Sequence, residues 1–122
     1  MAVILVVEDS LTTSTIVQGL LCKHGYVVHV ASDGLVALSA LKVFEPDMVL
    51  LDIRLPHVDG YQLCRFIRRQ LRYARLPVVM LSALSDPADQ RRALEAGANA
   101  YLKKPVDEKT LLATVEMHLV HA

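Results

Sequence analysis

Three carboxylates stand directly after short apolar runs in this sequence. Glu8 and Asp9 follow the run at 3–7, and Asp52 follows the run at 48–51. If the two runs are adjacent strands, these like charges lie within several Å of one another, which is unfavourable unless a cation or a shared proton relieves the repulsion. Oxygen ligands favour hard cations such as Mg²⁺. We therefore predict a divalent-cation site at Glu8, Asp9 and Asp52. The alternative is ordinary solvated strand ends, with Asp9 as a helix cap.

A hydroxyl and an ammonium group follow two further apolar runs. Ser82 follows the run at 78–81, and Lys104 follows the run at 101–102 after one further lysine. Carboxylates can form acyl phosphates, and phosphoryl transfer requires cations that neutralise the charge of the transferring group. Asp52 is thus the candidate nucleophile, with Lys104 paired to it at rest. Taken alone, Ser82 would be a turn residue and Lys104 a loop residue.

The apolar runs predict the elements that position these side chains. Short, continuously apolar runs between turn signals are typical of parallel strands that are buried on both faces. We expect strands at 3–7, 26–31, 48–51, 77–81 and 100–103, with a helical pattern after each. The alternation implies βαβ units with helices on both faces of the sheet. Function in such sheets lies at the carboxyl ends of the strands, where the side chains above would converge.

Capping residues and apolar periodicity predict the helices. Ser10, Asp33, Asp86 and Asp107 are expected caps, and the strand at 26–31 is expected near an edge because apolar and polar residues alternate there. Cys22 and Cys64 are expected to be buried small hydrophobes. The periodicity places several large apolar side chains on inward faces: Leu11, Ile16, Leu35, Phe66 and Leu94.

The bulk properties limit the domain count and the partners. The length of 122 residues and the hydrophobic content of 53% predict one domain over 1–122, with no output domain. Thirteen basic residues balance thirteen acidic ones, so neither a nucleic acid nor a membrane is expected as a direct partner. The apolar runs are far shorter than the roughly 20 residues of a spanning helix, and the N-terminus does not look like a signal peptide, so we expect a cytoplasmic protein.

Four motifs, in order, resemble those of the response regulator receiver domain of two-component signalling, of the chemotaxis-receiver type. They are Val-Val-Glu8-Asp9, Leu-Leu-Asp52 with Pro56 and Asp59-Gly60 after it, Leu-Ser82-Ala83, and Tyr101-Leu-Lys-Lys104-Pro105. The resemblance extends from Val3 to the last predicted helix. It implies a doubly wound (βα)5 flavodoxin-like fold, an α/β architecture whose five parallel strands have the order 2-1-3-4-5.

The resemblance also implies a role for each matching acidic residue. Asp52 matches the aspartate that accepts a phosphoryl group from a histidine kinase or a His phosphotransfer protein. Glu8, Asp9, Asp52 and the backbone carbonyl of Arg54 would bind Mg²⁺, with Mn²⁺ as a possible substitute.

The remaining matches concern the switch. Lys104 matches the family's lysine, and Lys104-Pro105 is the expected cis peptide. Ser82 matches the hydroxyl that moves to the phosphoryl group, and Tyr101 the aromatic residue that turns inward. The surface of the fourth helix, fifth strand and fifth helix would then change and meet an unidentified downstream protein. We expect a monomer or a phosphorylation-dependent dimer.

Classical enzymatic turnover is not expected. The resemblance implies at most Mg²⁺-dependent self-phosphorylation from a donor and slow autodephosphorylation. In the family that the sequence resembles, the positions of Arg54 and Leu84 tune the phosphoryl lifetime, and neither residue can position an attacking water as an amide or an acid can.

Three alternatives remain. A haloacid-dehalogenase-type phosphatase would need a second aspartate where Arg54 stands. A flavodoxin-like nucleotide-binding domain would need a glycine-rich loop after the first strand, where the sequence is Glu8-Asp9-Ser10-Leu11. A receiver-fold interaction module acting independently of phosphorylation is the third, and the presence of all the chemical residues argues against it.

Overall fold

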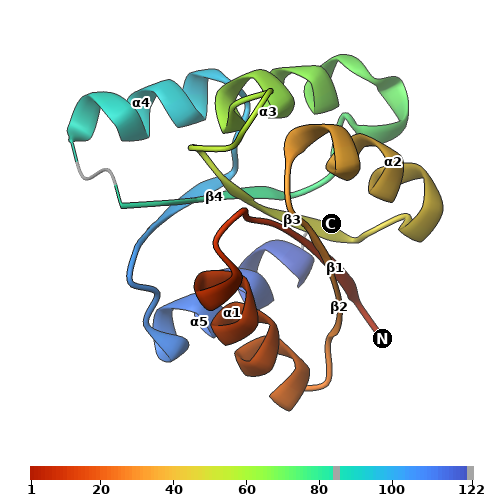
Figure 1. Ribbon diagram of the computed structural model, residues 1–122, viewed down its shortest axis with the longest axis vertical. Helices are drawn as coiled ribbons and strands as arrows, with labels where there is room; N and C mark the ends of the chain where they lie inside the picture. Colours follow the sequence, from red (N-terminus) through yellow and green to blue (C-terminus); the bar gives the residue numbers. More distant parts are fainter. Residues whose placement is uncertain (84–85, 121–122) are drawn as a thin grey trace.

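The computed structural model describes residues 1–83 and 86–120. Five strands alternate with five α-helices, and one short 3₁₀ helix follows α3 (Figure 1). The strands are β1 (Val3–Val7), β2 (Val27–Ala31), β3 (Met48–Asp52), β4 (Val78–Ser82) and β5 (Ala100–Lys103). The helices are α1 (Leu11–Lys23), α2 (Gly34–Phe44), α3 (Gly60–Arg69), η1 (Leu71–Tyr73), α4 (Pro87–Glu95) and α5 (Glu108–Val120).

The sheet has the predicted topology. All four strand pairs are parallel, and the order is β2-β1-β3-β4-β5. Helices α2, α3 and α4 cover one face and α1 and α5 cover the other, as Figure 1 shows above and below the sheet. Each face has its own apolar cluster, one that includes Leu51 and Ile67 and the other Leu50 and Leu111. The doubly wound α/β prediction is confirmed.

Burial follows the position of each strand in the sheet. All residues of β3 and β4 are buried, as expected for central parallel strands with helices on both sides. In β2, at the edge, only Val28 and Ala31 are buried, so the edge prediction for this strand is also confirmed. The strand bounds differ from the predicted ones by one residue at β2, at β3 and at β4.

The predicted helix caps are confirmed at their hydrogen bonds. The side chains of Ser10, Asp33, Asp86 and Asp107 accept bonds from backbone N–H groups of the first turn of their helices. Asp59 adds a capping box with Gln62 at the start of α3. None of the described helices is both long enough and apolar enough to cross a membrane.

Several individual side chains that were predicted to face inward do not. Five side chains expected to be buried are 43–80% exposed: Leu11, Ile16, Leu35, Phe66 and Leu94. In α4 the only buried residue is Ala93. In α4 the small Ala93 packs closely against the domain, and the adjacent Leu94 is then rotated outward. Cys22 is also exposed, whereas Cys64 is buried as expected.

Candidate functional site

The carboxyl edge of the sheet gathers the predicted chemical residues. The register pairs Val7 with Leu51 and Ser82 with Lys103, so the ends of β1, β3, β4 and β5 lie at one level. Backbone hydrogen bonds continue past the strand ends: Glu8 N–H donates to Ala31 (3.0 Å), and Lys104 N–H donates to Ser82 (2.8 Å). These bonds fix the backbone positions of Glu8 and Lys104.

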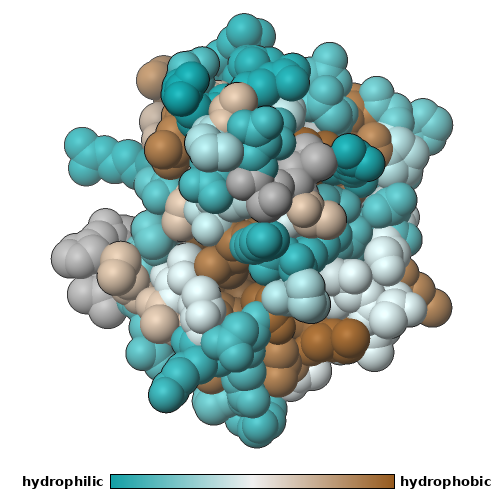
Figure 2. Space-filling model, turned by 90° about the vertical axis from the view of Figure 1, so that its left-hand side faces the viewer, coloured by the Kyte–Doolittle hydropathy of each residue, from teal (hydrophilic) through white to brown (hydrophobic). Residues whose placement is uncertain are grey.

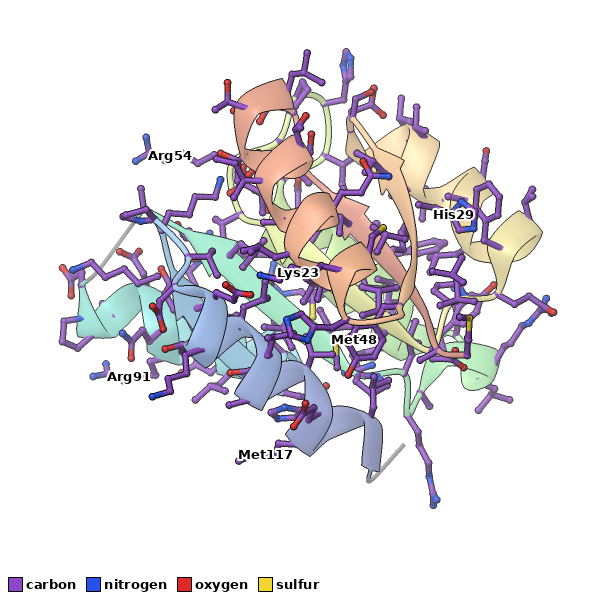
Figure 3. All side chains as sticks on the ribbon, turned by 90° about the horizontal axis from the view of Figure 1, so that it is seen from below. Lys23, His29, Met48, Arg54, Arg91 and Met117 are labelled. Carbon is purple, nitrogen blue, oxygen red and sulfur yellow. The ribbon has the colours of Figure 1, made fainter. Side chains whose placement is uncertain are left out.

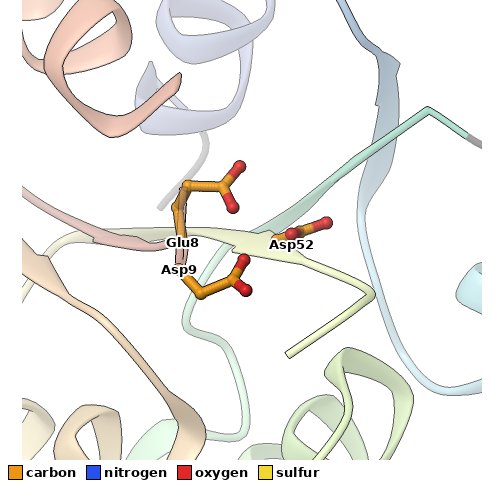
Figure 4. Close-up of side chains that lie close together, drawn as sticks. All are labelled: Glu8, Asp9 and Asp52. Atoms are coloured by element: carbon orange, nitrogen blue, oxygen red, sulfur yellow. The ribbon is translucent and has the colours of Figure 1, made fainter. Parts of the chain in front are cut away.

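Three carboxylates converge at this edge (Figure 4). One oxygen from each of Glu8, Asp9 and Asp52 lies within 4.8 Å of the other two. Glu8 and Asp52 are only 2% and 5% exposed, whereas Asp9 is exposed. An octahedral Mg²⁺ ion holds its ligand oxygens at about 2.1 Å, which places opposite ligands roughly 4 Å apart. The all-oxygen donor set and its size therefore fit a hard divalent cation bound from one side, with solvent on the other.

Lys104 neutralises part of this negative charge. Its Nζ donates a hydrogen bond to Glu8 Oε1 and lies 3.3 Å from Asp52 Oδ2, so one ammonium group serves both buried carboxylates. Burial works to lower the pKa of Lys104, but the hydrogen bond to Glu8 and the charges of Asp52 and Glu8 outweigh it and raise the pKa. The predicted pairing with Asp52 is present, and the pairing with Glu8 is additional.

The loop after β3 is held tightly under Asp52. Gly60 N–H donates to the Ile53 carbonyl at 2.7 Å, and Arg54 N–H donates to Asp52 Oδ1 at 3.3 Å. A Cβ at Gly60 would stand 2.4 Å from the Asp52 carbonyl oxygen, so a side chain cannot be accommodated without moving backbone. Figure 3 shows the Arg54 side chain extending away from the protein body at this edge. Gly60 thus allows α3 to begin directly against the acidic site.

The other predicted residues lie around the acidic cluster. Ser82 is 1% exposed at the end of β4, and Tyr101 is half-buried in β5 against the core on the α2–α4 side. The peptide bond between Lys104 and Pro105 is cis, as predicted. Leu84 lies outside the described residues.

Two residues beside the site were not singled out from the sequence. Tyr61 and Arg92 line an open pocket of about 570 Å³ together with Asp9 and Arg54. The Arg92 guanidinium carbon lies 4.3 Å from the centre of the Tyr61 ring, a cation–π contact between α4 and α3. The sequence alone could not predict this contact, because Tyr61 and Arg92 are 31 positions apart. It ties the helix after β4 to the helix that begins at the acidic site.

A parallel five-stranded sheet with this acidic cluster and its lysine places the chain in the receiver class of α/β signalling domains. The family model described as the response regulator receiver domain matches residues 4–116. The chain therefore belongs to this family, which functions in two-component signalling. The recognition made from the four motifs is confirmed.

The relatives agree with this assignment. RpaA of Synechocystis sp., a DNA-binding dual master transcriptional regulator, is 38% identical over 112 residues, covering 92% of this chain and 46% of RpaA. The chain spans about half the length of the curated relatives that it matches.

Two solved structures are similar over nearly the whole chain. The signal receiver domain of a signal transduction histidine kinase from Syntrophus aciditrophicus has a TM-score of 0.92 at 34% identity, covering 100% of this chain and 92% of that one. The receiver domain of the sensor histidine kinase PA1611 from Pseudomonas aeruginosa has a TM-score of 0.89 at 34% identity, covering 97% of each chain. That structure has a magnesium ion coordinated in its active site cleft.

Proposed function

We propose that this receiver domain accepts a phosphoryl group on Asp52 and changes a partner-binding surface in response. The observation that carries the proposal is the grouping of Glu8, Asp9 and Asp52, with Lys104 paired to Glu8 and Asp52, in a chain of the receiver family. A histidine kinase or a His phosphotransfer protein is the proposed donor. The downstream partner is a protein, and we propose no direct contact of this domain with nucleic acid.

The chemistry follows from the placement of Asp52. One of its carboxylate oxygens attacks phosphorus, a P–O bond forms, and the bond from phosphorus to the donor's nitrogen or oxygen breaks. Glu8, Asp9, Asp52 and the carbonyl of Arg54 would hold Mg²⁺, which when bound neutralises charge on the transferring group. Lys104 would supply a further positive charge, because its Nζ already lies 3.3 Å from Asp52 Oδ2.

The proposed switch uses Ser82 and Tyr101. A phosphoryl group on Asp52 brings new acceptor oxygens to the edge where the Ser82 hydroxyl ends β4, and a hydrogen bond between them would draw the following loop toward the site. Tyr101, half-buried in the neighbouring strand, would then turn inward. The surface of α4, β5 and α5 changes as a result, and we propose that it is the surface that the partner reads.

The donor is proposed to bind over the start of α1. Leu11 and Ile16 are 80% and 54% exposed although both are apolar. Ile16 also lines a small cavity of about 170 Å³ with Lys104 and Pro105, so apolar surface lies directly beside the acidic site. Figure 2, which views the carboxyl edge, shows hydrophobic residues gathered in the lower half of this face. Exposed apolar surface of this kind is typical of protein contacts.

An experiment can distinguish donor binding at this surface from phosphoryl transfer to Asp52. Ile16→Asp should slow phosphoryl transfer from a phosphorylated His phosphotransfer protein and leave labelling by acetyl phosphate unchanged. Leu94→Asp, an equally exposed position on α4, is the matched control for transfer. Equal transfer rates to the Ile16→Asp variant and to the parent would exclude the α1 surface.

Slow autodephosphorylation remains part of the proposal. The Arg54 side chain is exposed beside Asp52 and offers no acceptor for an attacking water. The aspartyl phosphate should live no longer in Arg54→Asn or Leu84→Glu than in the parent. A longer lifetime in either variant would contradict the reasoning.

The phosphorylation itself is tested by intact mass after incubation with acetyl phosphate. One phosphoryl adduct should form with Mg²⁺ and should be absent with EDTA. The adduct should also be absent in Asp52→Asn, which preserves the side-chain shape. An adduct that persists in this variant would contradict the assignment of Asp52. No adduct from acetyl phosphate or from a phosphorylated His phosphotransfer protein would favour an interaction module that acts without phosphorylation.

A further inference from the structure

One segment of this neutral chain has a high net positive charge. Between Asp59 and Asp86 the sequence carries five arginines and no aspartate, glutamate or lysine. The five are Arg65, Arg68, Arg69, Arg72 and Arg75. This segment forms α3, η1 and β4, and α3 lies beside α2 on the upper face of the sheet in Figure 1. The arginines therefore belong to a different face from α1 and its proposed donor surface.

Two of these arginines have structural partners. Arg68 donates to the carbonyls of Gly97 (2.8 Å) and Leu76 (2.7 Å) and to the Asn99 side chain (2.7 Å), so it joins α3 to the start of β5. Arg72 pairs with Glu45.

Arg65, Arg69 and Arg75 are exposed, and none of the three has an ion pair among the residues that the structure describes. Of these, Arg65 and Arg69 belong to α3. They are four positions apart on one helix, where like charges repel each other. No ion pair among the described residues offsets the repulsion between these two guanidinium groups.

The two arginines border an apolar groove. A groove of about 440 Å³ lies between α2, α3 and the loop after β3. Leu38, Val58 and Phe66 supply apolar surface, and Arg65 and Arg69 stand on the α3 side. Phe66 is 43% exposed, between the two arginines in sequence. We name this surface, formed by Leu38, Val58, Arg65, Phe66 and Arg69, the α3 groove.

The composition of the α3 groove favours a protein partner over a polyanion. Arginine and aromatic residues are enriched in protein–protein interfaces and lysine is depleted, and the guanidinium fork matches a carboxylate with two hydrogen bonds. Nucleic acid or an anionic membrane would require a longer track of positive charge. Beyond η1 the adjoining pocket carries Glu45 and Asp47, which interrupt such a track.

We propose that the α3 groove is a docking site for an acidic amphipathic segment of a partner protein. An apolar side chain of the segment fills the space beside Phe66, and flanking carboxylates pair with Arg65 and Arg69. The charge complementarity and the apolar floor together define this partner. The site is separate from Asp52, and its occupation does not require a phosphoryl group.

The proposal is tested with a fluorescein-labelled peptide in which glutamates flank one central tryptophan. Its binding to the full chain is followed by fluorescence anisotropy. Arg65→Gln/Arg69→Gln should weaken binding about tenfold or more, and Phe66→Ala should also weaken it. Arg91→Gln is the matched control, because Arg91 is an exposed arginine on α4 outside the groove, and it should leave binding unchanged. A peptide with glutamine in place of glutamate should bind more weakly than the acidic peptide.

Two further measurements make the result decisive. Each variant is labelled with acetyl phosphate, and unchanged labelling shows that the fold and the Asp52 site are intact. A single-stranded oligonucleotide and phosphatidylserine vesicles are titrated in parallel. Equal peptide affinity for the parent and the double variant would overturn the proposal, as would no binding to the parent. Tighter, Arg65- and Arg69-dependent binding of either polyanion would overturn it in favour of a phosphate-binding surface.

Discussion

Removing the exposed carboxylate of the acidic cluster should stabilise the metal-free protein. In Asp9→Asn the shape is kept and one negative charge is lost. Glu8 and Asp52 share the single charge of Lys104, so Asp9 faces a net charge of about −1 at distances up to 4.8 Å. Coulomb's law gives about 0.9 kcal/mol for one such pair in water and about 3.5 kcal/mol at an effective dielectric constant of 20. Because Asp9 is exposed, the lower figure applies, and the expected gain is about 1 kcal/mol.

Mg²⁺ should reverse the order of stability. A ligand that binds only the folded state raises the free energy of unfolding by an amount that depends on its affinity. If the loss of one carboxylate weakens Mg²⁺ binding tenfold, the stabilisation by saturating Mg²⁺ falls by about 1.4 kcal/mol. Urea unfolding is therefore measured for both proteins in EDTA and in about 10 mM MgCl₂, with Glu95→Gln, an exposed carboxylate on α4, as the control. The variant should be the more stable protein in EDTA and the less stable one in Mg²⁺. A variant that is destabilised in EDTA, or that gains as much from Mg²⁺ as the parent, would refute the electrostatic reasoning.

Three further predictions concern single residues of the site and the core. Gly60→Ala should lower the free energy of unfolding by about 2 kcal/mol in urea titrations, because its Cβ would meet the Asp52 carbonyl; an unchanged midpoint would exclude that close contact. Lys104 has a raised pKa, so its stabilising contribution is present below its ordinary pKa of 10.5 and is lost as pH rises through the folded-state pKa. The stability difference between the parent and Lys104→Met should therefore be constant at neutral pH and shrink in strongly alkaline buffer, and a difference that grew there would contradict the pairing. A thiol reagent should modify Cys22 in the native protein but reach Cys64 only after unfolding, because burial shields Cys64 and raises its pKa; fast native labelling of both would be the contrary result.

The sheet could be predicted from the sequence because central parallel strands carry an unusual signal. Runs such as 48–51 are apolar at every position, because both faces of a central strand are covered. A helix on the surface of a domain has apolar residues on one face only. The turn and cap residues between the runs then fix the order of the elements along the chain. The strand order came from the resemblance to the receiver family, since alternation alone does not determine which strands are neighbours.

The inward faces of the helices were harder to predict. Apolar periodicity predicted that Leu94 faces the core. In the structure Leu94 is exposed and its neighbour Ala93 is buried. Which side chain faces inward depends on how closely the helix approaches its neighbours, and that distance is a property of the packed domain. The predictions that Leu11 and Ile16 are buried were wrong for the same reason. In the proposed function these two exposed residues form part of the donor surface.

The sequence predicted which residues form the candidate site, but only some of the contacts between them. Strand ends identify Glu8, Asp9 and Asp52 because parallel strands end at the same edge. The sharing of Lys104 between Glu8 and Asp52 depends on side-chain geometry, which spacing does not contain. The contact of Arg92 with Tyr61 likewise joins residues that only the fold brings together.

The most direct test of the central claim is chemical trapping of the phosphorylated residue. The chain is incubated with acetyl phosphate and Mg²⁺ and then treated with borohydride, which reduces an aspartyl phosphate to homoserine. Peptide mass spectrometry locates the reduced residue. We predict homoserine at position 52 alone and none when EDTA replaces Mg²⁺. Homoserine at Asp9 or elsewhere, or a phosphoryl adduct that yields no homoserine, would contradict the assignment of Asp52 as the phospho-acceptor.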